Sequence, residues 1–345
     1  MSPAARTADF DYPLPQELIA QAPLAERDAS RLLVLDRAAG TTTHRTFRSF
    51  PELPAPPDVV VINDSRVIPA RLHARRRGGG AAELLLVTRE AEGTWRAMVR
   101  PGARIRPGAR LQLGPGDEVE VIAVLDGGQR RVRLHGPGGD DAIIRRRGQV
   151  PLPPYITRAP DAADRERYQT VFAVTPGSVA APTAGLHFTP AILARLAIRG
   201  VAVARLTLHV GPGTFQPVTA HDPAEHRLGP EAYAIPPETA RTLAEARSRG
   251  GKVWAVGTTV TRTLEMCADA GGTVRPGVGW TSLFIQPGHS FRVVDRLLTN
   301  FHLPRSTLLM LVSAFAGRER ILAAYEEAIT QRYRFYSYGD AMLIL

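Results

Sequence analysis

The segment DVVVINDSR at residues 58–66 decides the fold. Its apolar run within residues 58–62 is typical of a strand that is covered on both faces in the middle of an α/β sheet. The run ends in polar residues, without the glycine-rich turn that a Rossmann dinucleotide or methyltransferase site needs. Polar side chains at the end of a buried strand face the crevice where α/β domains bind ligands, although a turn or a helix cap explains Asn63 and Asp64 equally well.

Downstream of residue 150, strand and helix patterns alternate. A Thr189-Pro190 pair predicts the start of a helix, because Thr caps and Pro suits the first helical position, and Gly200 predicts its end. Alternating strands and helices predict a three-layer α/β domain. The expected strands are residues 201–210, 252–256 and 281–285, and the expected helices are residues 190–199, 237–249, 258–270 and 318–333.

Residues 67–150 have a different texture. Short runs of alternating apolar residues are separated by closely spaced Gly and Pro residues, which is typical of a small antiparallel β-barrel. The run Pro151-Leu152-Pro153-Pro154 predicts the end of this unit, because it continues neither a helix nor a central strand. The chain is therefore expected to hold an α/β domain of residues 1–66 and 151–345, with the barrel of residues 67–150 inserted into it.

Positive charge is concentrated in the predicted barrel. The formal net charge of the chain is +10, and residues 67–150 hold 16 Arg against nine Asp and Glu. A GC-rich genome explains why almost every basic residue is Arg, but it does not explain the excess over acidic residues. Such a segment favours a polyanionic partner, because each neutralised phosphate releases counterions, although basic surfaces also occur on proteins that never contact nucleic acid.

Several classes of protein are excluded. The single cysteine, Cys267, cannot form an internal disulfide or supply a cysteine-based zinc site, and no His, Asp and Glu spacing resembles a metal site. The longest apolar run, residues 308–316, has about half the length that a membrane span needs. The N-terminal residues lack the apolar region of a secretion signal. We expect a soluble, cytoplasmic protein with no metal and no membrane partner.

Two histidines follow apolar or small-residue segments. His187 lies in the run PTAGLHF of residues 182–188, and His209 lies near the end of the strand expected at residues 201–210, after its apolar residues. Histidine titrates near neutral pH, so either ring is a candidate proton carrier, although a lone histidine is more often structural.

Further polar clusters lie between expected elements. Gly257-Thr258-Thr259 offers free N–H groups and hydroxyls to an anion, or it simply caps the next helix, in which Arg262 and Glu265 are spaced to pair. Polar and aromatic residues also fill residues 300–304 and 336–340, and polarity so near the C-terminus normally indicates a solvated loop.

Taken together, these clusters resemble the S-adenosylmethionine:tRNA ribosyltransferase-isomerases of queuosine biosynthesis. The resemblance runs from Asp9 to Leu345 and is most specific in the run PGSVAAPTAGLHF at residues 176–188. The other matching runs are RDASRLL (27–33), NDSRVIPARL (63–72), PLPPYI (151–156), YQTVF (168–172), TLHVG (207–211), TNFHLP (299–304) and YGDAM (338–342).

The resemblance implies an α/β domain interrupted by a small β-barrel. It also implies an enzyme that uses S-adenosylmethionine as a ribosyl donor rather than a methyl donor. The acceptor is the 7-aminomethyl-7-deazaguanine base at the wobble position of certain tRNAs, and the products are epoxyqueuosine in the tRNA, adenine and methionine.

This reaction needs proton transfer at the ribose C5′, at the departing purine and at the attacking amine. The implied proton carriers are His187, His209 and Asp340, and Asp340 is also a candidate contact for the sulfonium or the amine. Arg66, Arg262, Thr258 and Thr259 are candidates to hold the donor's carboxylate or a tRNA phosphate. The remaining candidates for donor and base binding are Asn63, Asp64, Thr183, Gly185, Asn300, His302 and Tyr338.

The basic barrel is expected to contact tRNA phosphates, so that binding weakens steeply with salt. Its candidate residues are Arg75, Arg76, Arg77, Arg145, Arg146 and Arg147.

One loop departs from the pattern of the family. After His226-Arg227 the family usually has Met-His-Ser-Glu, whereas this chain has Leu228-Gly229-Pro230-Glu231. If the loop touches substrate, the acceptor differs, so one alternative is a paralogue that transfers an alkyl or ribosyl group to another nucleobase or to a small molecule. A second alternative is a non-catalytic RNA-binding scaffold, which the intact motifs disfavour. A conventional methyltransferase is a third, weakened by the missing glycine turn.

Overall fold

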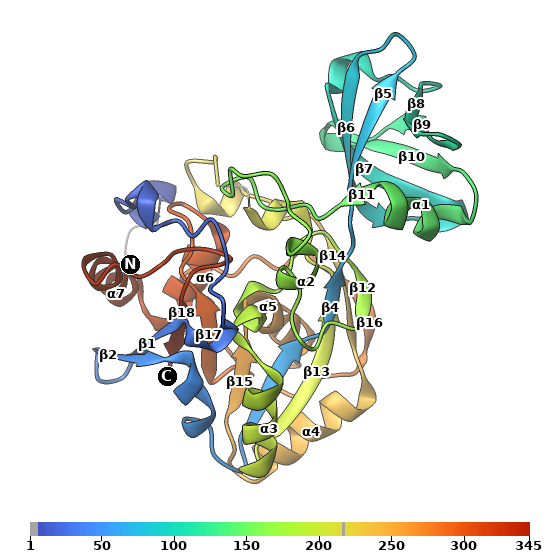
Figure 1. Ribbon diagram of the computed structural model, residues 1–345. Helices are drawn as coiled ribbons and strands as arrows, with labels where there is room; N and C mark the ends of the chain where they lie inside the picture. Colours follow the sequence, from blue (N-terminus) through green and yellow to red (C-terminus); the bar gives the residue numbers. More distant parts are fainter. Residues whose placement is uncertain (1–5, 216–217) are drawn as a thin grey trace.

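The computed structural model describes residues 6–215 and 218–345, which form a large α/β part and a small barrel that stands beside it (Figure 1). The α/β part is built on a mixed nine-stranded sheet. In spatial order its strands are β16 (Gly277–Thr281), β14 (Glu231–Ile235), β13 (Ala202–Leu208), β3 (Val59–Asn63), β15 (Val253–Val256), β17 (Arg296–Asn300), β18 (Ala341–Ile344), β1 (Arg31–Asp36) and β2 (Thr41–Thr46).

Strand β3 lies near the middle of this sheet, and all its residues are buried. Val59 and Val61 pack into one hydrophobic cluster, whereas Val60 and Ile62 pack into another on the opposite face. Because both faces are covered, the strand is apolar throughout. The predicted three-layer α/β fold is confirmed. The covering helices are α3 (Pro190–Ile198), α4 (Pro237–Ser248), α5 (Thr258–Cys267), α6 (Thr307–Ala316) and α7 (Arg318–Thr330).

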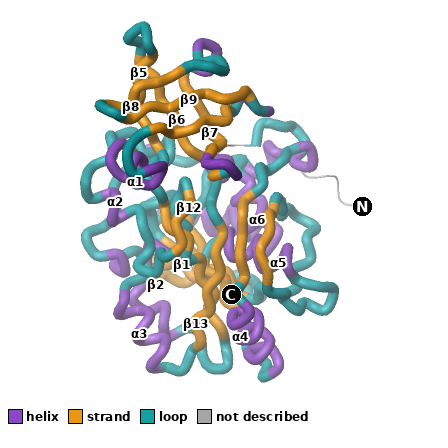
Figure 2. The backbone as a smooth tube through the Cα atoms, turned by 90° about the vertical axis from the view of Figure 1, so that its right-hand side faces the viewer, coloured by secondary structure: helices purple, strands orange, loops and turns teal. Residues whose placement is uncertain are grey.

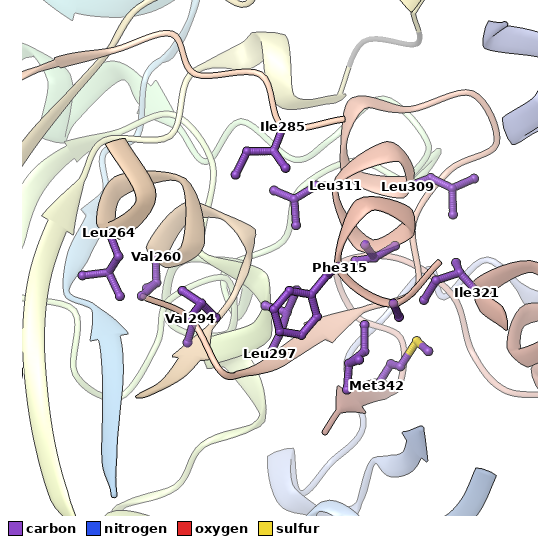
Figure 3. Packing of buried hydrophobic residues seen from close by; sticks show 14 of the residues in the cluster. Val260, Leu264, Ile285, Val294, Leu297, Leu309, Leu311, Phe315, Ile321 and Met342 are labelled. Atoms are coloured by element: carbon purple, nitrogen blue, oxygen red, sulfur yellow. The ribbon is translucent and has the colours of Figure 1, made fainter. Parts of the chain in front are cut away.

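The two clusters differ in size. In the larger one, Leu264 of α5, Phe315 of α6 and Ile321 of α7 meet Leu297 of β17 and Met342 of β18 (Figure 3). On the opposite face, α3 packs with the 3₁₀ helix of residues 47–52. Each buried side chain of this size contributes about 1.5–3 kcal/mol relative to exposure, so the sheet is a rigid platform for its strand ends.

The barrel is a closed antiparallel sheet, because its first strand also pairs with β8 (Figure 2). Inward residues such as Leu72 and Ala74 alternate with exposed ones, so the barrel has a hydrophobic core of its own. The predicted antiparallel barrel is confirmed. Its elements are β5 (Arg71–Arg76), β6 (Ala81–Arg89), β7 (Thr94–Arg100), β8 (Arg110–Gly114), β9 (Asp117–Val124), β10 (Arg130–His135), helix α1 (Gly139–Arg147) and a short β11 (Gly148–Gln149) that adds to β5.

The chain enters and leaves the barrel at one point. On the way in, β4 (Ser65–Val67) pairs in parallel with β12 (Thr175–Ser178). On the way out, Gly148 lies against the carbonyl of Pro69, and a Cβ at Gly148 would come within 1.9 Å of that oxygen. Only glycine allows the two backbones to approach so closely. The return segment passes the short helix α2 (Asp164–Arg167) before it reaches β12.

One expected strand is wrong, and two elements of the barrel were not expected from the sequence. The strand expected at residues 281–285 is wrong: β16 is Gly277–Thr281, and the chain then turns, with the Leu283 N–H donating to Thr281 Oγ1 at 3.2 Å. Ile285 is apolar because it fills the core from a loop. Strand β5 and helix α1 were not expected, since their Arg-rich sequences hide the apolar pattern. Within the described ranges, no helix is long and apolar enough to cross a bilayer.

Candidate active site

A cleft separates the rim of the barrel from the edge of the sheet formed by β13, β14 and β16. It consists of two adjoining cavities of about 730 and 710 Å³, which share Val87–Arg89, Gly211, Pro230, Glu231 and Trp280 in their walls. We call the first the loop cavity, because residues 228–230 line it, and the second the histidine cavity, because His209 lines it. Arg66 and Arg145, both predicted binding residues, also line the histidine cavity.

A chain of hydrogen bonds holds His209 at the end of β13. The Val210 N–H donates to Ser178 Oγ at 2.9 Å, and Ser178 Oγ forms a short hydrogen bond with Ser65 Oγ. Ser65 Oγ in turn lies 2.9 Å from Nδ1 of His209. Ser65 and Ser178 are fully buried, on the paired strands β4 and β12, so they hold the ring in a fixed place.

The direction of this chain fixes the tautomer of His209. Since Ser178 accepts from Val210, its own proton goes to Ser65, and the Ser65 proton then goes to Nδ1 of the ring. The reverse direction leaves the Ser178 proton without an acceptor among the contacts of the described residues. The neutral ring therefore carries its proton on Nε2, and burial lowers the pKa of His209, which keeps the ring neutral.

Glycine is required beside this ring. A Cβ at Gly177 would come within 2.7 Å of Cε1 of His209, and the residue has a φ of +150°. The imidazole therefore packs directly on backbone, which leaves no room for a side chain between β12 and β13.

Glu231 is the buried carboxylate of the cleft. One oxygen, Oε1, accepts from the Gly211 N–H at 2.9 Å, and Oε2 lies 2.5 Å from Nη1 of Arg262. Arg262 also donates from Nε to the Leu283 carbonyl at 2.8 Å, so it stands behind Glu231 rather than in the cleft. The alternative that Arg262 pairs with Glu265 is wrong, because Glu265 accepts from three backbone N–H groups of residues 292–294.

The predicted residues at the end of β3 are engaged inside the protein. Asn63 bridges to β13: its amide donates to the Leu208 carbonyl at 2.9 Å, and its Oδ1 accepts from the Leu208 N–H at 3.0 Å. The same amide lies 3.4 Å from Thr259 Oγ1, which stands beside the buried Thr258 at the start of α5. Asp64 accepts from Thr207 Oγ1 at 2.6 Å. These contacts join the carboxyl ends of β3 and β13 directly behind His209.

A second group of predicted residues is buried beside β17. His187 has its Nδ1 2.8 Å from Ser30 Oγ and its Nε2 3.1 Å from the Asn300 amide, so both ring nitrogens are engaged. Burial, with the positive charges of Arg27 and Arg334, lowers the pKa of His187 to about 3. The ring is therefore neutral at physiological pH.

Asn300 connects this group to the C-terminal loop. Its amide also lies 3.2 Å from the Tyr336 carbonyl and 3.4 Å from the Asp340 carbonyl, while its buried Oδ1 has no hydrogen-bond partner among the described residues. The Asp340 carboxylate accepts from the backbone N–H groups of Arg31 and Arg334, each at 2.8 Å, and burial raises its pKa. The expectation of a solvated loop is wrong, because residues 336–340 are buried where the chain enters β18, between β17 and β1.

The remaining predicted residues lie around small cavities near this group. His302 is buried with Nε2 2.8 Å from Thr299 Oγ1, and burial lowers its pKa to about 3. Thr183 lines a cavity of about 40 Å³ together with Asn300 and His302. Gly185 is packed so tightly that a Cβ would come within 2.7 Å of Phe172.

Tyr338 is tied to the return segment from the barrel. It donates to Oδ1 of Asp164 at 2.9 Å, and burial raises its pKa. Arg158 donates two hydrogen bonds to the same carboxylate, at 2.6 and 2.7 Å. The structure therefore brings the predicted site residues together as two groups, one at the cleft and one beside β17.

The barrel arginines are not equivalent. Arg75, Arg76 and Arg77 lie at the tip of the hairpin of β5 and β6, which points away from the α/β part (Figures 1 and 2). Arg146 and Arg147 both bind Asp117, at 2.7 Å each, and the hydrogen bond from Arg146 lowers the pKa of that carboxyl. Arg145 faces the cleft instead.

Sequence reasoning did not single out several residues that line or support the cleft. Ser65 and Ser178 stood inside quoted motifs, but nothing in the sequence shows that two hydroxyls from separate strands meet. Trp280 gave no signal, since an aromatic residue in a strand normally indicates core. Over the ranges that the structure describes, no three His, Cys, Asp or Glu side chains are grouped so that they could share a metal ion.

Comparison with known proteins agrees with this architecture. The model of a family described as "Queuosine biosynthesis protein" matches residues 7–344. The chain is 54% identical to the S-adenosylmethionine:tRNA ribosyltransferase-isomerase of Symbiobacterium thermophilum, over 99% of this chain and 100% of that protein. It is 55% identical to the enzyme of the same name from Anaeromyxobacter dehalogenans strain 2CP-C, over 99% of each chain. The chain belongs to the S-adenosylmethionine:tRNA ribosyltransferase-isomerase family.

A solved structure supports the same assignment. The crystal structure of the S-adenosylmethionine tRNA ribosyltransferase of Thermotoga maritima is 42% identical, with a TM-score of 0.57, and the match covers 98% of this chain and 100% of that one. The predicted family, enzyme class and role in queuosine biosynthesis are confirmed by these matches.

Proposed function

We propose that this ribosyltransferase-isomerase carries out its reaction in the cleft between the barrel and the sheet. S-adenosylmethionine gives its ribosyl group to the 7-aminomethyl-7-deazaguanine base of a tRNA, and adenine and methionine leave. The observation that carries the proposal is the placement of His209 and Glu231 in the same cavity as Arg66 and Arg145. Proton donor, carboxylate and phosphate-binding groups thus share one solvent-accessible space.

The chemistry assigns a role to His209. As adenine leaves, negative charge develops on the departing purine, and a neutral imidazole with its proton on Nε2 stabilises that charge by donating a hydrogen bond to it. The lowered pKa of His209 makes the imidazolium unfavourable, so the ring stays neutral while it donates this hydrogen bond.

Glu231 suits a cationic group. Its carboxylate is held in place by Arg262 and by the Gly211 N–H, and it borders both cavities. We assign it to the sulfonium of the donor or to the amine of the acceptor base, a contact that the sequence also suggested for Asp340. Arg262 then acts through Glu231.

His187 and Asp340 are the alternative proton carriers. His187 must break its hydrogen bond to Ser30 or to Asn300 before it can exchange a proton with substrate. The raised pKa of Asp340 favours uptake of a proton, but both its oxygens accept backbone N–H groups. Substitution of His187 and of His209, one at a time, therefore tests which of the two takes part in the reaction.

The barrel, residues 67–150, is proposed to hold the tRNA. Its hairpin arginines, 75–77, are placed for phosphates distant from the cleft, and Arg145 for one beside the reacting base. Arg146 and Arg147 are held by Asp117 and present the remaining edge of their guanidinium groups.

One observation favours a different acceptor as the alternative. The loop Leu228-Gly229-Pro230, which departs from the family pattern, lines the loop cavity directly. The substitution of a His and a hydroxyl residue by Gly and Pro removes polar groups from the wall where an acceptor would lie. An acceptor other than the deazaguanine base, or a small molecule, is therefore the alternative.

The test is to incubate the protein with S-adenosylmethionine and tRNA that carries the deazaguanine precursor, and to follow adenine and the modified base by mass spectrometry. Adenine that appears only with this tRNA supports the proposal. Adenine that appears with another acceptor supports the alternative, and S-adenosylhomocysteine in place of adenine contradicts both. We expect His209→Gln to lower single-turnover adenine release by about 10²-fold or more.

A matched control separates the two histidines. His221 is exposed and lines neither cavity, so His221→Gln should release adenine at the rate of the unaltered protein. His187→Gln is the discriminating variant. If His187→Gln loses adenine release while His209→Gln keeps normal turnover, the reaction takes place at the group beside β17 and not in the cleft.

A further inference from the structure

The three tryptophans of the chain are in unlike environments. Trp95 and Trp254 are each 5% exposed, and their indole N–H groups donate to Asp140 at 2.8 Å and to Asp58 at 2.9 Å. Trp280 is 54% exposed. The first two rings are therefore parts of the hydrophobic cores, whereas the third presents much of its surface to solvent.

Trp280 stands in the wall of the cleft. It lies on β16, the edge strand of the sheet, directly opposite Ala232 of β14. It borders both the loop cavity and the histidine cavity, and is thus one of the residues that join them. With only an alanine beside it on the neighbouring strand, the indole has an uncovered face.

The charges around this face are mainly positive. Arg66, Arg89, Arg145 and Arg165 line the histidine cavity with Trp280, against the acidic Asp141 and Glu231. An uncovered aromatic face beside guanidinium groups is the combination that proteins use for single-stranded nucleic acid, since the ring stacks on a base while the arginines bind phosphates.

We propose that Trp280 is the platform on which the acceptor nucleobase of the tRNA stacks in the cleft. This inference rests on the proposed function and adds the residue that holds the base in the histidine cavity. The adenine of S-adenosylmethionine is the competing occupant. The tRNA base is favoured because Trp280 lies at the junction of two large open cavities that the basic barrel rim borders, where a base attached to a polyanion can enter.

The first experiment uses the intrinsic fluorescence of the full-length protein. Trp254 is buried and lines neither cavity, and Trp95 borders the histidine cavity but is only 5% exposed, so binding of an anticodon stem-loop that carries the deazaguanine precursor should quench mainly Trp280. Wild type should show saturable quenching, and Trp280→Phe should lose most of it at RNA concentrations where fluorescence anisotropy of a labelled stem-loop reports full binding. Equal quenching in Trp280→Phe would overturn the inference.

The second experiment measures affinity. Trp280→Ala should weaken binding of the stem-loop by about ten-fold or more, the usual effect of removing a stacking partner, whereas Trp280→Phe should stay within about three-fold of wild type. Val278→Ala is the matched control, because Val278 is 83% exposed on the same strand and lines neither cavity. Urea unfolding of each variant confirms that the strand is intact.

Calorimetry with S-adenosylmethionine separates the two occupants. Unchanged donor affinity in Trp280→Ala, with weakened RNA binding, supports the inference, and weakened donor binding with unchanged RNA affinity overturns it. If wild type neither binds the stem-loop nor releases adenine, the proposed function itself fails. If wild type does both and Trp280→Ala matches it, the inference fails alone.

Discussion

Acidification should destabilise this protein steeply, because two fully buried histidines resist protonation. Burial lowers the pKa of His187 and of His302 to about 3 in the folded protein, while an unfolded histidine has a pKa of about 6.5. Between these values the unfolded chain takes up protons that the folded chain does not. The free energy of unfolding therefore falls as the pH falls below about 6.5.

The size of the effect follows from these values. At pH 5 each histidine lowers the free energy of unfolding by about 2 kcal/mol, and the pair lowers it by about 4 kcal/mol. This is a large part of the total stability of about 5–15 kcal/mol that is typical of domains. At pH 7.5 both histidines are neutral in either state, and the contribution vanishes.

The assay is urea unfolding, followed by circular dichroism, at pH 7.5, 6 and 5. His302→Gln removes one of the two groups, and the Gln side chain can still reach Thr299, whose hydroxyl lies 2.8 Å from the ring in wild type. The variant should be less stable than wild type at pH 7.5, and the difference should shrink by about 2 kcal/mol at pH 5. The exposed His221→Gln serves as the control and should follow wild type. A constant difference between His302→Gln and wild type across this range would refute the reasoning.

Three further predictions concern the cleft and the barrel. Ser65→Ala breaks the hydrogen-bond chain to Nδ1 of His209, so we expect about ten-fold slower single turnover and a shift of the ring toward a mixture of tautomers; ¹⁵N NMR of the ring that shows an unchanged tautomer would contradict this. Asp117→Asn weakens the contacts of a buried side chain, 1% exposed, with the guanidinium groups of Arg146 and Arg147, so the melting temperature should fall by about 5 °C in calorimetry. An unchanged melting temperature would show that these two ion pairs contribute nothing to stability. Replacement of residues 75–77 by Gln should weaken tRNA binding and flatten its dependence on salt, and an identical salt titration would rule out phosphate contacts there.

The fold was predictable where one local signal dominates. The apolar run before Asn63 indicates a strand with two covered faces, and Thr189 caps α3 as the sequence suggests, accepting from the Ile192 N–H at 3.2 Å. The apolar residues of 281–285 misled because burial alone does not distinguish a strand from a core-filling loop. Likewise, helix α7 ends at Thr330, while Tyr333 beyond it is buried for reasons of tertiary packing.

The site was predictable in its residues more than in its arrangement. The sequence picks out His187 and His209, yet it does not tell that one has both nitrogens bound inside the protein and the other borders a large cavity. The partner of Arg262 was missed because Glu231 is distant in sequence. Contacts between strands that are far apart along the chain depend on sheet order, which local patterns do not encode.

The place of β18 in the sheet has a consequence for synthesis on the ribosome. Residues 341–344 form the strand between β17 and β1, so β1 cannot acquire its parallel neighbour until residue 341 has been translated. The barrel has no such dependence, since all its strands lie within residues 71–149 and β5 pairs with β8 to close it. A nascent chain would thus carry a closed barrel while its nine-stranded sheet is still incomplete, and the apolar surface exposed at that stage would belong to the sheet.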